Sequence, residues 1–288
     1  MPEGDTIFRT ARTLRQVLSD QLIERAKARV FTDGATTGFP GSVNLIPGPH
    51  FAIGQQWHPV ESFAGRIVEA VEPQGKHMVI VLDDGRAIHS HLGMTGAWHV
   101  YRPGEPWQKP EKRARLVLEV SGFVVICFTP MVLELCSPTA LRRHRFINGL
   151  GPDLLAPEID IDDMIARFRR HNRAPIGEAV MNQTIVCGIG NIYKSELLFL
   201  SNINPFAPVS SLADDALRDL LELARDLMRQ NLQEPERTTR YQGDGHRLWV
   251  YPRTGQPCFL CGTTIQIRRQ GELGRTTYWC ARCQEGGV

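Results

Sequence analysis

The apolar positions near the N-terminus repeat at intervals of four and three residues. Ile7, Ala11, Leu14 and Leu18 follow this spacing, which places them on one face of an amphipathic helix. After about residue 66 the pattern changes to short runs rich in β-branched and aromatic residues. The predicted strands are residues 66–71, 77–82, 87–91, 114–120 and 123–128. Several short antiparallel strands behind one helix predict a β-sandwich.

Turn-forming residues separate these strands. Residues 83–86 (Asp-Asp-Gly-Arg) and 121–122 (Ser-Gly) are predicted hairpin turns, and the proline-rich stretch 102–110 is a predicted loop. The composition changes at residues 149–152 (Gly-Leu-Gly-Pro), where we expect a domain boundary. We therefore expect a catalytic sandwich over residues 1–150, a helical domain over 151–250 and a small module over 251–288.

Helical patterns dominate the middle of the chain. Two helical stretches are predicted between residues 176 and 202, joined by the glycine-containing turn 185–190. Ser211 and Asp214 have the spacing of a capping box before a further helix. The apolar stripe of that helix, which we expect to pack in the core, is Leu217, Leu220, Leu221, Ala224, Leu227 and Met228.

Two Cys-x-x-Cys pairs close the chain, and eighteen residues separate them. Four thiolates at this spacing are typical of one tetrahedral structural zinc ion. Residues 263–267 and 275–279 are predicted strands around a turn at 270–274, so the tail is expected to be a zinc-bound β-hairpin with Arg275 near its tip. The expected zinc ligands are Cys258, Cys261, Cys280 and Cys283.

Charge is distributed unevenly over the 288 residues, whose formal net charge is +2. From residue 237 onward, eight arginines against three acids give +5, so the rest of the chain carries −3. A basic terminal module is typical of polyanion binders, although a solvated surface would have the same composition. The polar N-terminus, the lack of a long apolar run and three further isolated cysteines predict a protein of the reducing cytoplasm, without a signal peptide or membrane span.

The N-terminal residues carry candidate chemistry. Removal of Met1 would leave Pro2 with a free secondary amine, and an α-amino group has a pKa of about 7.7–8. Such an amine is partly neutral at pH 7 and can form a Schiff base with an aldehyde-level carbon. Glu3 could donate the proton that opens a sugar ring. Met-Pro-Glu is also a common start without any function.

Three further positions have both a structural and a functional interpretation. Lys76 begins an apolar strand, where it is either a solvated strand end or a phosphate contact. His89 and His91 share one strand face and could bind metal, but the sequence indicates no third ligand. Met94 is either a core residue or an apolar wedge for a gap in a base stack. The turn before Asn191 offers backbone N–H groups that suit phosphate, but most such turns only connect helices.

Five motifs occur in the order and spacing of one protein family, and together they span essentially the whole chain. They are Met1-Pro2-Glu3-Gly4, Gly75-Lys76-His77, His91-Leu92-Gly93-Met94, Gly188-Ile189-Gly190-Asn191-Ile192-Tyr193-x-x-Glu196 and Gly274-Arg275-x-Thr277-x-x-Cys280-x-x-Cys283-Gln284. With them the chain resembles the formamidopyrimidine-DNA glycosylase/endonuclease VIII family. The resemblance implies an α+β multidomain fold: an N-terminal β-sandwich, a helix-two-turn-helix domain and a C-terminal zinc β-hairpin holding one structural zinc ion.

The resemblance also implies a bifunctional DNA glycosylase and abasic-site lyase of base excision repair, acting by β,δ-elimination. By position, Pro2 would be the nucleophile that attacks C1′, and Glu3 the acid/base. Lys76 would contact phosphate and assist elimination. The implied partner is double-stranded DNA with damaged bases or abasic sites, bound by a monomer in the bacterial cytoplasm.

The remaining positions that match the family's motifs would contact DNA. His91 would bind phosphate, and Met94 would fill the void left by a flipped base. Asn191 and Arg275 would hold the phosphates that flank the lesion, and Arg275 would also belong to the catalytic site.

Two departures bear on the substrate. Thr6 replaces a glutamate that the family usually has near the damaged base, and residues 128–134 lack the intercalating Arg-Phe pair of the oxidised-purine branch. The N-terminal Met1-Pro2-Glu3-Gly4 together with the missing pair resembles the endonuclease VIII branch, which implies oxidised pyrimidines, with an oxidised-purine glycosylase as the alternative. Two other classes remain open: a non-enzymatic zinc-finger DNA-binding protein and, more remotely, a metal hydrolase that uses His89 and His91.

Overall fold

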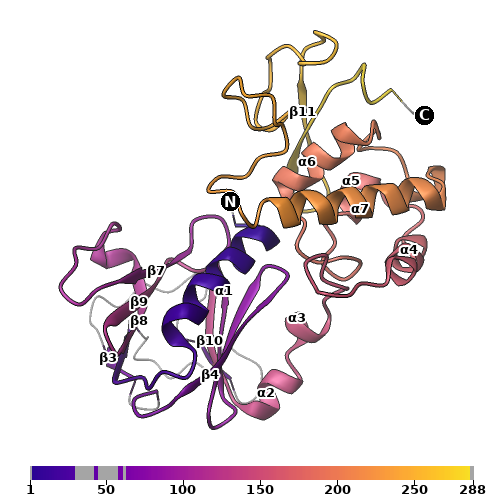
Figure 1. Ribbon diagram of the computed structural model, residues 1–288. Helices are drawn as coiled ribbons and strands as arrows, with labels where there is room; N and C mark the ends of the chain where they lie inside the picture. The colour runs from indigo at the N-terminus through magenta and orange to yellow at the C-terminus, as the bar shows by residue number, and fades with distance from the viewer. Residues whose placement is uncertain (1, 30–41, 45–57, 61–62, 286–288) are drawn as a thin grey trace. The chain divides into compact units, whose positions relative to one another are not determined.

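The computed structural model describes residues 2–29, 42–44, 58–60 and 63–285, and the chain divides into two compact units (Figure 1). Thr6–Gly149 and the first two residues form the first unit. Leu150–Val288 form the second unit together with the short segment Glu3–Asp5. The described part of the chain contains no helix that is long and apolar enough to cross a membrane. Glu3 therefore belongs structurally to the C-terminal half of the chain.

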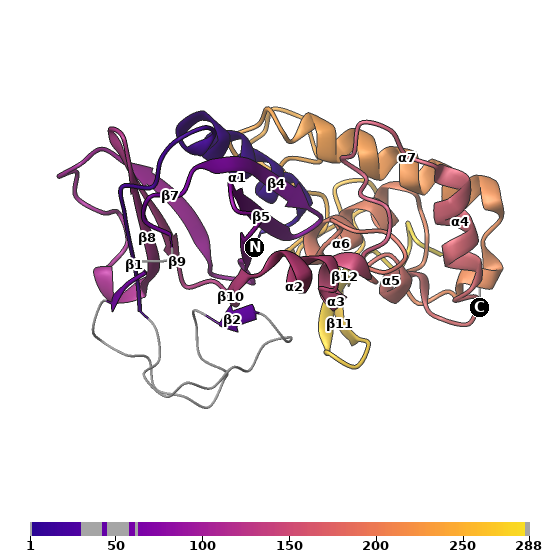
Figure 2. The same cartoon turned by 90° about the horizontal axis from the view of Figure 1, so that it is seen from below.

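The first unit is the predicted β-sandwich, built from two antiparallel sheets (Figure 2). One sheet has the order β3 (His58–Pro59), β1 (Arg25–Ala28), β8 (Ala114–Val120), β9 (Phe123–Phe128) and β7 (Ala97–Tyr101). The other has the order β2 (Ser42–Asn44), β10 (Val132–Cys136), β6 (Ala87–His91), β5 (His77–Leu82) and β4 (Val68–Gln74). Three short helices complete the unit: η1 (Glu111–Arg113), α2 (Pro138–Arg142) and α3 (Arg145–Asn148).

The core of the sandwich contains side chains from both sheets and from α1 (Gly4–Leu18). The predicted helix face, from Ile7 to Leu18, is buried there together with Ile80 of β5 and Leu118 of β8. Each of these isoleucine and leucine side chains contributes about 1.5–3 kcal/mol when it is fully buried. The four-and-three spacing of the apolar residues thus predicted both the helix and its buried face.

The structure confirms four predicted strands with their bounds and shifts the fifth. Residues 77–82, 87–91, 114–120 and 123–128 are β5, β6, β8 and β9. The strand predicted at 66–71 is β4, Val68–Gln74. Arg66 instead lies 3.3 Å from Asp84, and Ile67 makes only an isolated bridge to Leu22. Pairing with β5 extends β4 to Gln74, which the local sequence did not indicate.

The second unit is helical and carries the C-terminal hairpin (Figure 1). Its elements are α4 (Ile161–Arg169), α5 (Ile176–Ala179), α6 (Asn191–Leu200), η2 (Val209–Ser211), α7 (Asp214–Gln230), β11 (Gln266–Gln270) and β12 (Arg275–Trp279). The apolar stripe of α7 is buried, as predicted for core packing. Helix α6 is buried on nearly all sides because it packs against α5, α7 and β12.

The predicted capping box before α7 is wrong. The helix begins at Asp214 with Ala213 as its N-cap residue, and no side chain caps it. The Ser211 hydroxyl donates to the carbonyl of Pro208 at 2.7 Å instead, because Ser211 ends η2. Asp214 accepts from Arg169 of α4 at 2.7 Å. A tertiary ion pair thus uses the carboxylate that the local pattern assigned to the cap.

The first strand of the hairpin lies three residues later than predicted. β11 starts at Gln266 and ends at Gln270, so the turn is 271–274. Residues 263–265 instead bond to the cysteine loop: Cys258 donates its N–H to the Thr263 carbonyl at 2.8 Å. The Gln270 side chain is buried, where it donates to the Pro205 carbonyl and accepts from Thr277.

Candidate active site and metal centre

Glu3 is fully buried and accepts three backbone hydrogen bonds at the start of α6. Its carboxylate oxygens accept from the N–H groups of Gly190 at 2.9 Å, Ile192 at 2.8 Å and Tyr193 at 3.3 Å. These N–H groups have no partner within the helix, and a negative charge is favourable at a helix N-terminus. The sequence suggested that N–H groups at this turn bind phosphate. They donate to the Glu3 carboxylate instead, so that hypothesis is wrong.

Glycines allow this close approach of two distant segments. A Cβ atom on Gly190 would lie 2.4 Å from Cδ of Glu3, and one on Gly4 would lie 2.9 Å from Cα of Gly188. The N–H of Gly4 donates to the Gly188 carbonyl at 2.9 Å. The N-terminal motif and the glycine-rich turn are nearly two hundred residues apart in the sequence, but they pack directly against each other in the fold.

Asp5 and Arg237 complete this buried site, and sequence reasoning missed both. Arg237 donates through Nε to Asp5 Oδ2 at 3.0 Å and through Nη2 to Oδ1, and its Nη1 lies 3.9 Å from Glu3 Oε1. The Tyr193 hydroxyl donates to Asp5 Oδ2 at 3.3 Å. Burial opposes the charge of Arg237, but Glu3 and Asp5 raise its pKa above the ordinary value. The sequence analysis had counted Arg237 only as part of the basic tail.

Pro2 is half-buried and directly precedes Glu3. The proposed nucleophile is therefore attached to a carboxylate that backbone hydrogen bonds hold in place. Because that carboxylate is fully buried and hydrogen-bonded, its position is well defined.

Lys76 lies in the turn before β5, and His91 lies on the neighbouring strand β6 of the first unit. Lys76 follows Gly75, whose φ is +57°, and precedes β5, while His91 ends β6 opposite His77. His91 Nδ1 accepts from the Gly93 N–H at 3.2 Å, so the neutral ring carries its proton on Nε2. Burial, followed by the charge of Lys76, lowers the pKa of His91 to about 4. His91 is thus a neutral donor at pH 7, next to a cation.

His89 belongs to a different group from the one that the sequence indicated. The other members of this group are Glu134, which lies directly opposite His89 in the sheet, and His144. His91 does not belong to it. The three residues offer one ligand atom each within 4.8 Å of one another, so the third ligand that the sequence did not indicate is present. His89 and Glu134 alternate with the core residues Ile88 and Leu133 along their strands, so their side chains point away from the hydrophobic core.

Hydrogen bonds account for this group without a metal ion. His144 Nδ1 accepts from the Ile147 N–H, so its Nε2–H donates to Glu134 at 3.0 Å. His89 Nδ1 lies 3.4 Å from the same carboxylate oxygen, and its Nε2 lies 2.8 Å from Nδ1 of His77. Burial opposes the charge of Glu134, but the two histidines lower its pKa to about 2. His89 and His144 are also fully buried. A metal ion bound by them would therefore have no open coordination position for the substrate of a hydrolase.

Asn191, Lys194 and Arg275 meet where α6 packs against β12. Asn191 Nδ2 donates to Thr276 Oγ1 at 3.2 Å, while its buried Oδ1 has no partner. Lys194 Nζ donates to the Thr276 carbonyl at 3.0 Å and to Thr277 Oγ1 at 2.8 Å. Burial lowers the pKa of Lys194 to about 8. Lys194 and Arg275 line the same cavity, of about 560 Å³, in the second unit.

Lys194 is a second residue that sequence reasoning left without a role. Its position one helical turn after Asn191 was the available signal, since residues three apart share a helix face. Which strand lay opposite that face was decided only by tertiary packing.

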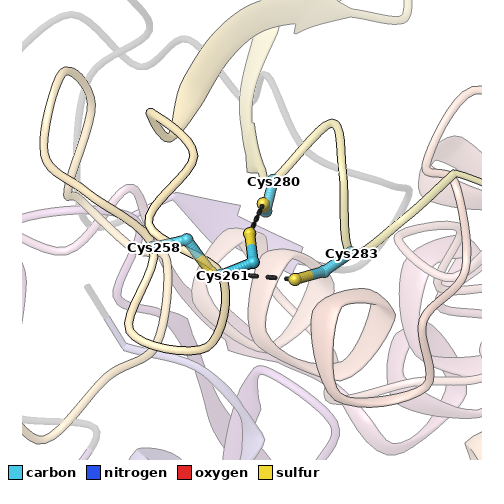
Figure 3. Close-up of side chains that lie close together, drawn as sticks. All are labelled: Cys258, Cys261, Cys280 and Cys283. Atoms are coloured by element: carbon cyan, nitrogen blue, oxygen red, sulfur yellow. Dashed lines mark hydrogen bonds between the residues drawn. The ribbon is translucent and has the colours of Figure 1, made fainter.

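The four C-terminal cysteines point toward one another (Figure 3). Cys258 and Cys283 have their sulfur atoms 3.8 Å apart, and Cys261 and Cys280 have theirs 3.4 Å apart. A Zn–S distance of about 2.3 Å in a tetrahedron separates the sulfurs by about 3.8 Å, so the arrangement fits a zinc ion. The group packs on the rest of the unit, because the buried Cys258 and Cys280 share a cluster with Phe199 of α6.

Comparison with known proteins identifies the family. The family model for the formamidopyrimidine-DNA glycosylase N-terminal domain matches residues 1–130, and that for the formamidopyrimidine-DNA glycosylase H2TH domain matches residues 150–242. The probable endonuclease 8 2 of Streptomyces coelicolor is 34% identical over 99% of this chain and 95% of its own. The DNA-(apurinic or apyrimidinic site) lyase Nei2 of Mycolicibacterium smegmatis is 36% identical over 99% of each chain.

Solved structures show the same fold. The Lactococcus lactis formamidopyrimidine-DNA glycosylase in complex with abasic-site DNA superposes with a TM-score of 0.77. The two sequences are 22% identical, and the match covers 99% of this chain and 100% of the other.

Proposed function

The chain belongs to the formamidopyrimidine-DNA glycosylase/endonuclease VIII family and is a DNA glycosylase and abasic-site lyase of base excision repair. From this premise we propose that it excises oxidised pyrimidines through a Schiff base on Pro2 and then cleaves the strand by β,δ-elimination. The observation that carries the proposal is the buried carboxylate of Glu3, held by three backbone N–H groups beside that amine.

Pro2 and Glu3 account for release of the base and for opening of the sugar ring. The neutral Pro2 amine forms a bond to C1′ while the glycosidic bond breaks and the base departs with its electron pair. Glu3 accepts the proton that the new ammonium loses and gives it to the ring oxygen O4′, which opens the sugar as the iminium forms. Water then takes a C2′ proton from the iminium, which breaks the C3′–O bond and expels the 3′ phosphate. In the second elimination water takes the C4′ proton, which breaks the C5′–O bond and expels the 5′ phosphate.

DNA binding is assigned to groups that can donate to phosphate. Lys76, in the turn before β5, offers a cation, and His91, on the adjacent strand β6, offers a neutral Nε2–H. Arg275 offers a guanidinium at the start of β12. A half-turn of the Asn191 amide would let Oδ1 accept from the Thr276 hydroxyl and direct Nδ2–H toward a phosphate.

The preference for pyrimidines rests on the curated relatives and on two positions in the sequence. The relatives at 34% and 36% identity are named endonuclease 8 and Nei2. The chain begins with Met1-Pro2-Glu3-Gly4, and residues 128–134 lack the intercalating Arg-Phe pair of the oxidised-purine branch. A purine glycosylase is the alternative, and a panel of thymine glycol, dihydrouracil and 8-oxoguanine duplexes separates the two.

We assign the four cysteines to one structural zinc ion, because their sulfur separations match a tetrahedral site. Zinc would hold the two cysteine loops together and so support the hairpin that carries Arg275. It has no role in the chemistry that Pro2 and Glu3 perform.

Borohydride trapping tests the mechanism. Reduction of the Schiff base should link abasic DNA covalently to the N-terminal peptide, whereas a non-enzymatic zinc-finger protein would not cross-link at all. A cross-link that maps to a lysine peptide would remove Pro2 from the nucleophile's role.

A further inference from the structure

Lys194 is a buried lysine whose hydrogen bonds both go to the strand that begins with Arg275. The residue is only 1% exposed. Its Nζ donates to the Thr276 carbonyl at 3.0 Å and to Thr277 Oγ1 at 2.8 Å, and an ammonium group has a third N–H beyond these two. Within the described residues no carboxylate forms an ion pair with Lys194, and a buried charge without such a partner costs stability. A role in binding would account for this cost.

The bonds of Lys194 begin a polar chain that fixes the hairpin on the helices. The Thr277 hydroxyl, which accepts from Lys194, donates to Gln270 Oε1 at 2.6 Å. Gln270 Nε2 donates in turn to the Pro205 carbonyl at 2.9 Å. Gln270 ends β11 directly opposite Arg275, the first residue of β12. Buried hydrogen bonds therefore fix the place at which Arg275 leaves the hairpin.

Three side chains with N–H donors meet at Thr276. Lys194 binds its carbonyl, and Asn191, one helical turn earlier, donates to its hydroxyl at 3.2 Å. Arg275 directly precedes it and is exposed, and within the described residues its guanidinium has no hydrogen bond or ion pair. Cationic and amide side chains of this kind are the groups with which proteins bind the phosphates of DNA.

The charges around Lys194 indicate why a second cation is needed beside Arg275. Both residues line the cavity of about 560 Å³ together with Glu178 and Glu272. With His171, the remaining titratable residue of the lining, counted as neutral, two cations balance two carboxylates. Without Lys194 one cation would face two carboxylates, and their net negative charge would repel a phosphate bound at Arg275. The charge of Lys194 removes this repulsion.

We propose that the ammonium group of Lys194 is part of the site at which Asn191 and Arg275 bind a DNA phosphodiester; this inference rests on the proposed function. Its charge offsets the carboxylates of the lining, and its third N–H is available to the phosphate. The affinity for DNA therefore depends on the proton that Lys194 carries.

The charge of Lys194 can be removed without any substitution. Burial lowers the pKa of Lys194 to about 8; Glu3 and Glu178 oppose this shift, and Arg275 adds to it. A neutral amine retains two N–H groups, which are enough for the bonds to Thr276 and Thr277. Raising the pH thus removes the charge and leaves the hairpin in place. A bound phosphate raises the pKa of Lys194, so the affinity for DNA falls as the pH rises, about tenfold for each unit of that increase.

The test measures binding to a duplex with a tetrahydrofuran analogue of the abasic site, which has no aldehyde and forms no Schiff base. The affinity of the wild type should fall about tenfold between pH 7 and pH 9.5. Lys194→Met should bind about tenfold more weakly at pH 7 and lose the part of the pH dependence that Lys194 contributes. The Pro2 amine titrates in the same range in every variant, so the difference between wild type and Lys194→Met isolates Lys194.

Two further variants complete the comparison. Lys194→Arg keeps its charge to high pH, so it should bind like the wild type at pH 7 and show the reduced pH dependence. It gives the same comparison if Lys194→Met does not fold. Lys112→Met, which removes an exposed lysine of the first unit, is the matched control and should keep the affinity and the pH dependence of the wild type.

Two outcomes would overturn the proposal. The wild type and the Lys194 variants could show the same pH dependence, or Lys194→Met could bind weakly while the wild type keeps its full affinity at pH 9.5. The second result would leave Lys194 a purely structural role. Borohydride trapping of the wild type on abasic DNA separates the two hypotheses: failure to trap removes the proposed function, whereas trapping together with either outcome removes only the role of Lys194.

Discussion

Replacing Arg237 with methionine should strongly destabilise the second unit. The guanidinium is 9% exposed and lies between the fully buried carboxylates of Asp5 and Glu3. Methionine keeps much of the aliphatic stem and removes the charge. Glu3 keeps its three backbone donors in the variant, so the effect falls mainly on Asp5, which loses the cation that binds both of its oxygens.

The magnitude follows from the burial of the pair. Removing one partner of a buried ion pair costs about 3–5 kcal/mol, because the other charge stays buried and loses its counter-charge. Removing both charges with Asp5→Asn should recover much of this loss, with a coupling energy of about 2–3 kcal/mol. The exposed pair between Arg218 and Asp162 is the matched control, and Arg218→Met should leave the free energy of unfolding nearly unchanged because solvent screens exposed pairs.

Urea denaturation at pH 7 without DNA measures all four variants: the two arginine substitutions, Asp5→Asn and the double variant. If Arg237→Met and Arg218→Met were equally stable, the buried pair would not have the importance assigned to it. If the cost of the double variant equalled the sum of the single costs, Arg237 and Asp5 would not be coupled.

Four further predictions concern the active site, the DNA contacts and the metal. Glu3→Gln should impair base excision more than cleavage of a preformed abasic site, because an abasic site already offers its aldehyde; equal loss in both assays with normal DNA binding would contradict the role of Glu3. Arg275→Ala should weaken binding to every lesion duplex and reduce the slope of log K against log salt by about one; a loss for one lesion at an unchanged slope would place Arg275 in base recognition. Lys194 has a pKa of about 8 in the folded protein and of about 10.4 in the unfolded chain, so the unfolded chain binds more protons between these two pH values. The free energy of unfolding should therefore rise with pH over this range. Lys194→Met should remove the rise, as measured by denaturation at pH 8 and pH 10. Elemental analysis should find one zinc per chain, and chelation or Cys280→Ser should weaken DNA binding while the sandwich stays folded; full DNA affinity in zinc-free protein would contradict the structural role of the metal.

Local patterns in the sequence determined several elements with their bounds. The spacing of Ile7, Ala11, Leu14 and Leu18 specified α1 and its buried face, because a helix face repeats every 3.6 residues. Four strands matched because β-rich runs lay between turn residues that end them. The two Cys-x-x-Cys pairs predicted that the four cysteines would form one group able to hold a metal ion, because ligand spacing within each pair is a local property.

Tertiary structure decided which of these pieces meet. The sequence contained Glu3 and the turn ending at Gly190 as separate motifs, but only folding brings the carboxylate to the helix N-terminus. Pairing of β6 with β10 placed Glu134 opposite His89, and no local spacing encodes that register. The ion pair of Asp5 with Arg237 likewise joins residues whose separation along the chain gives no signal. Periodicity and capping patterns report interactions within one element, whereas the active site is made of contacts between elements, and those depend on how whole faces pack.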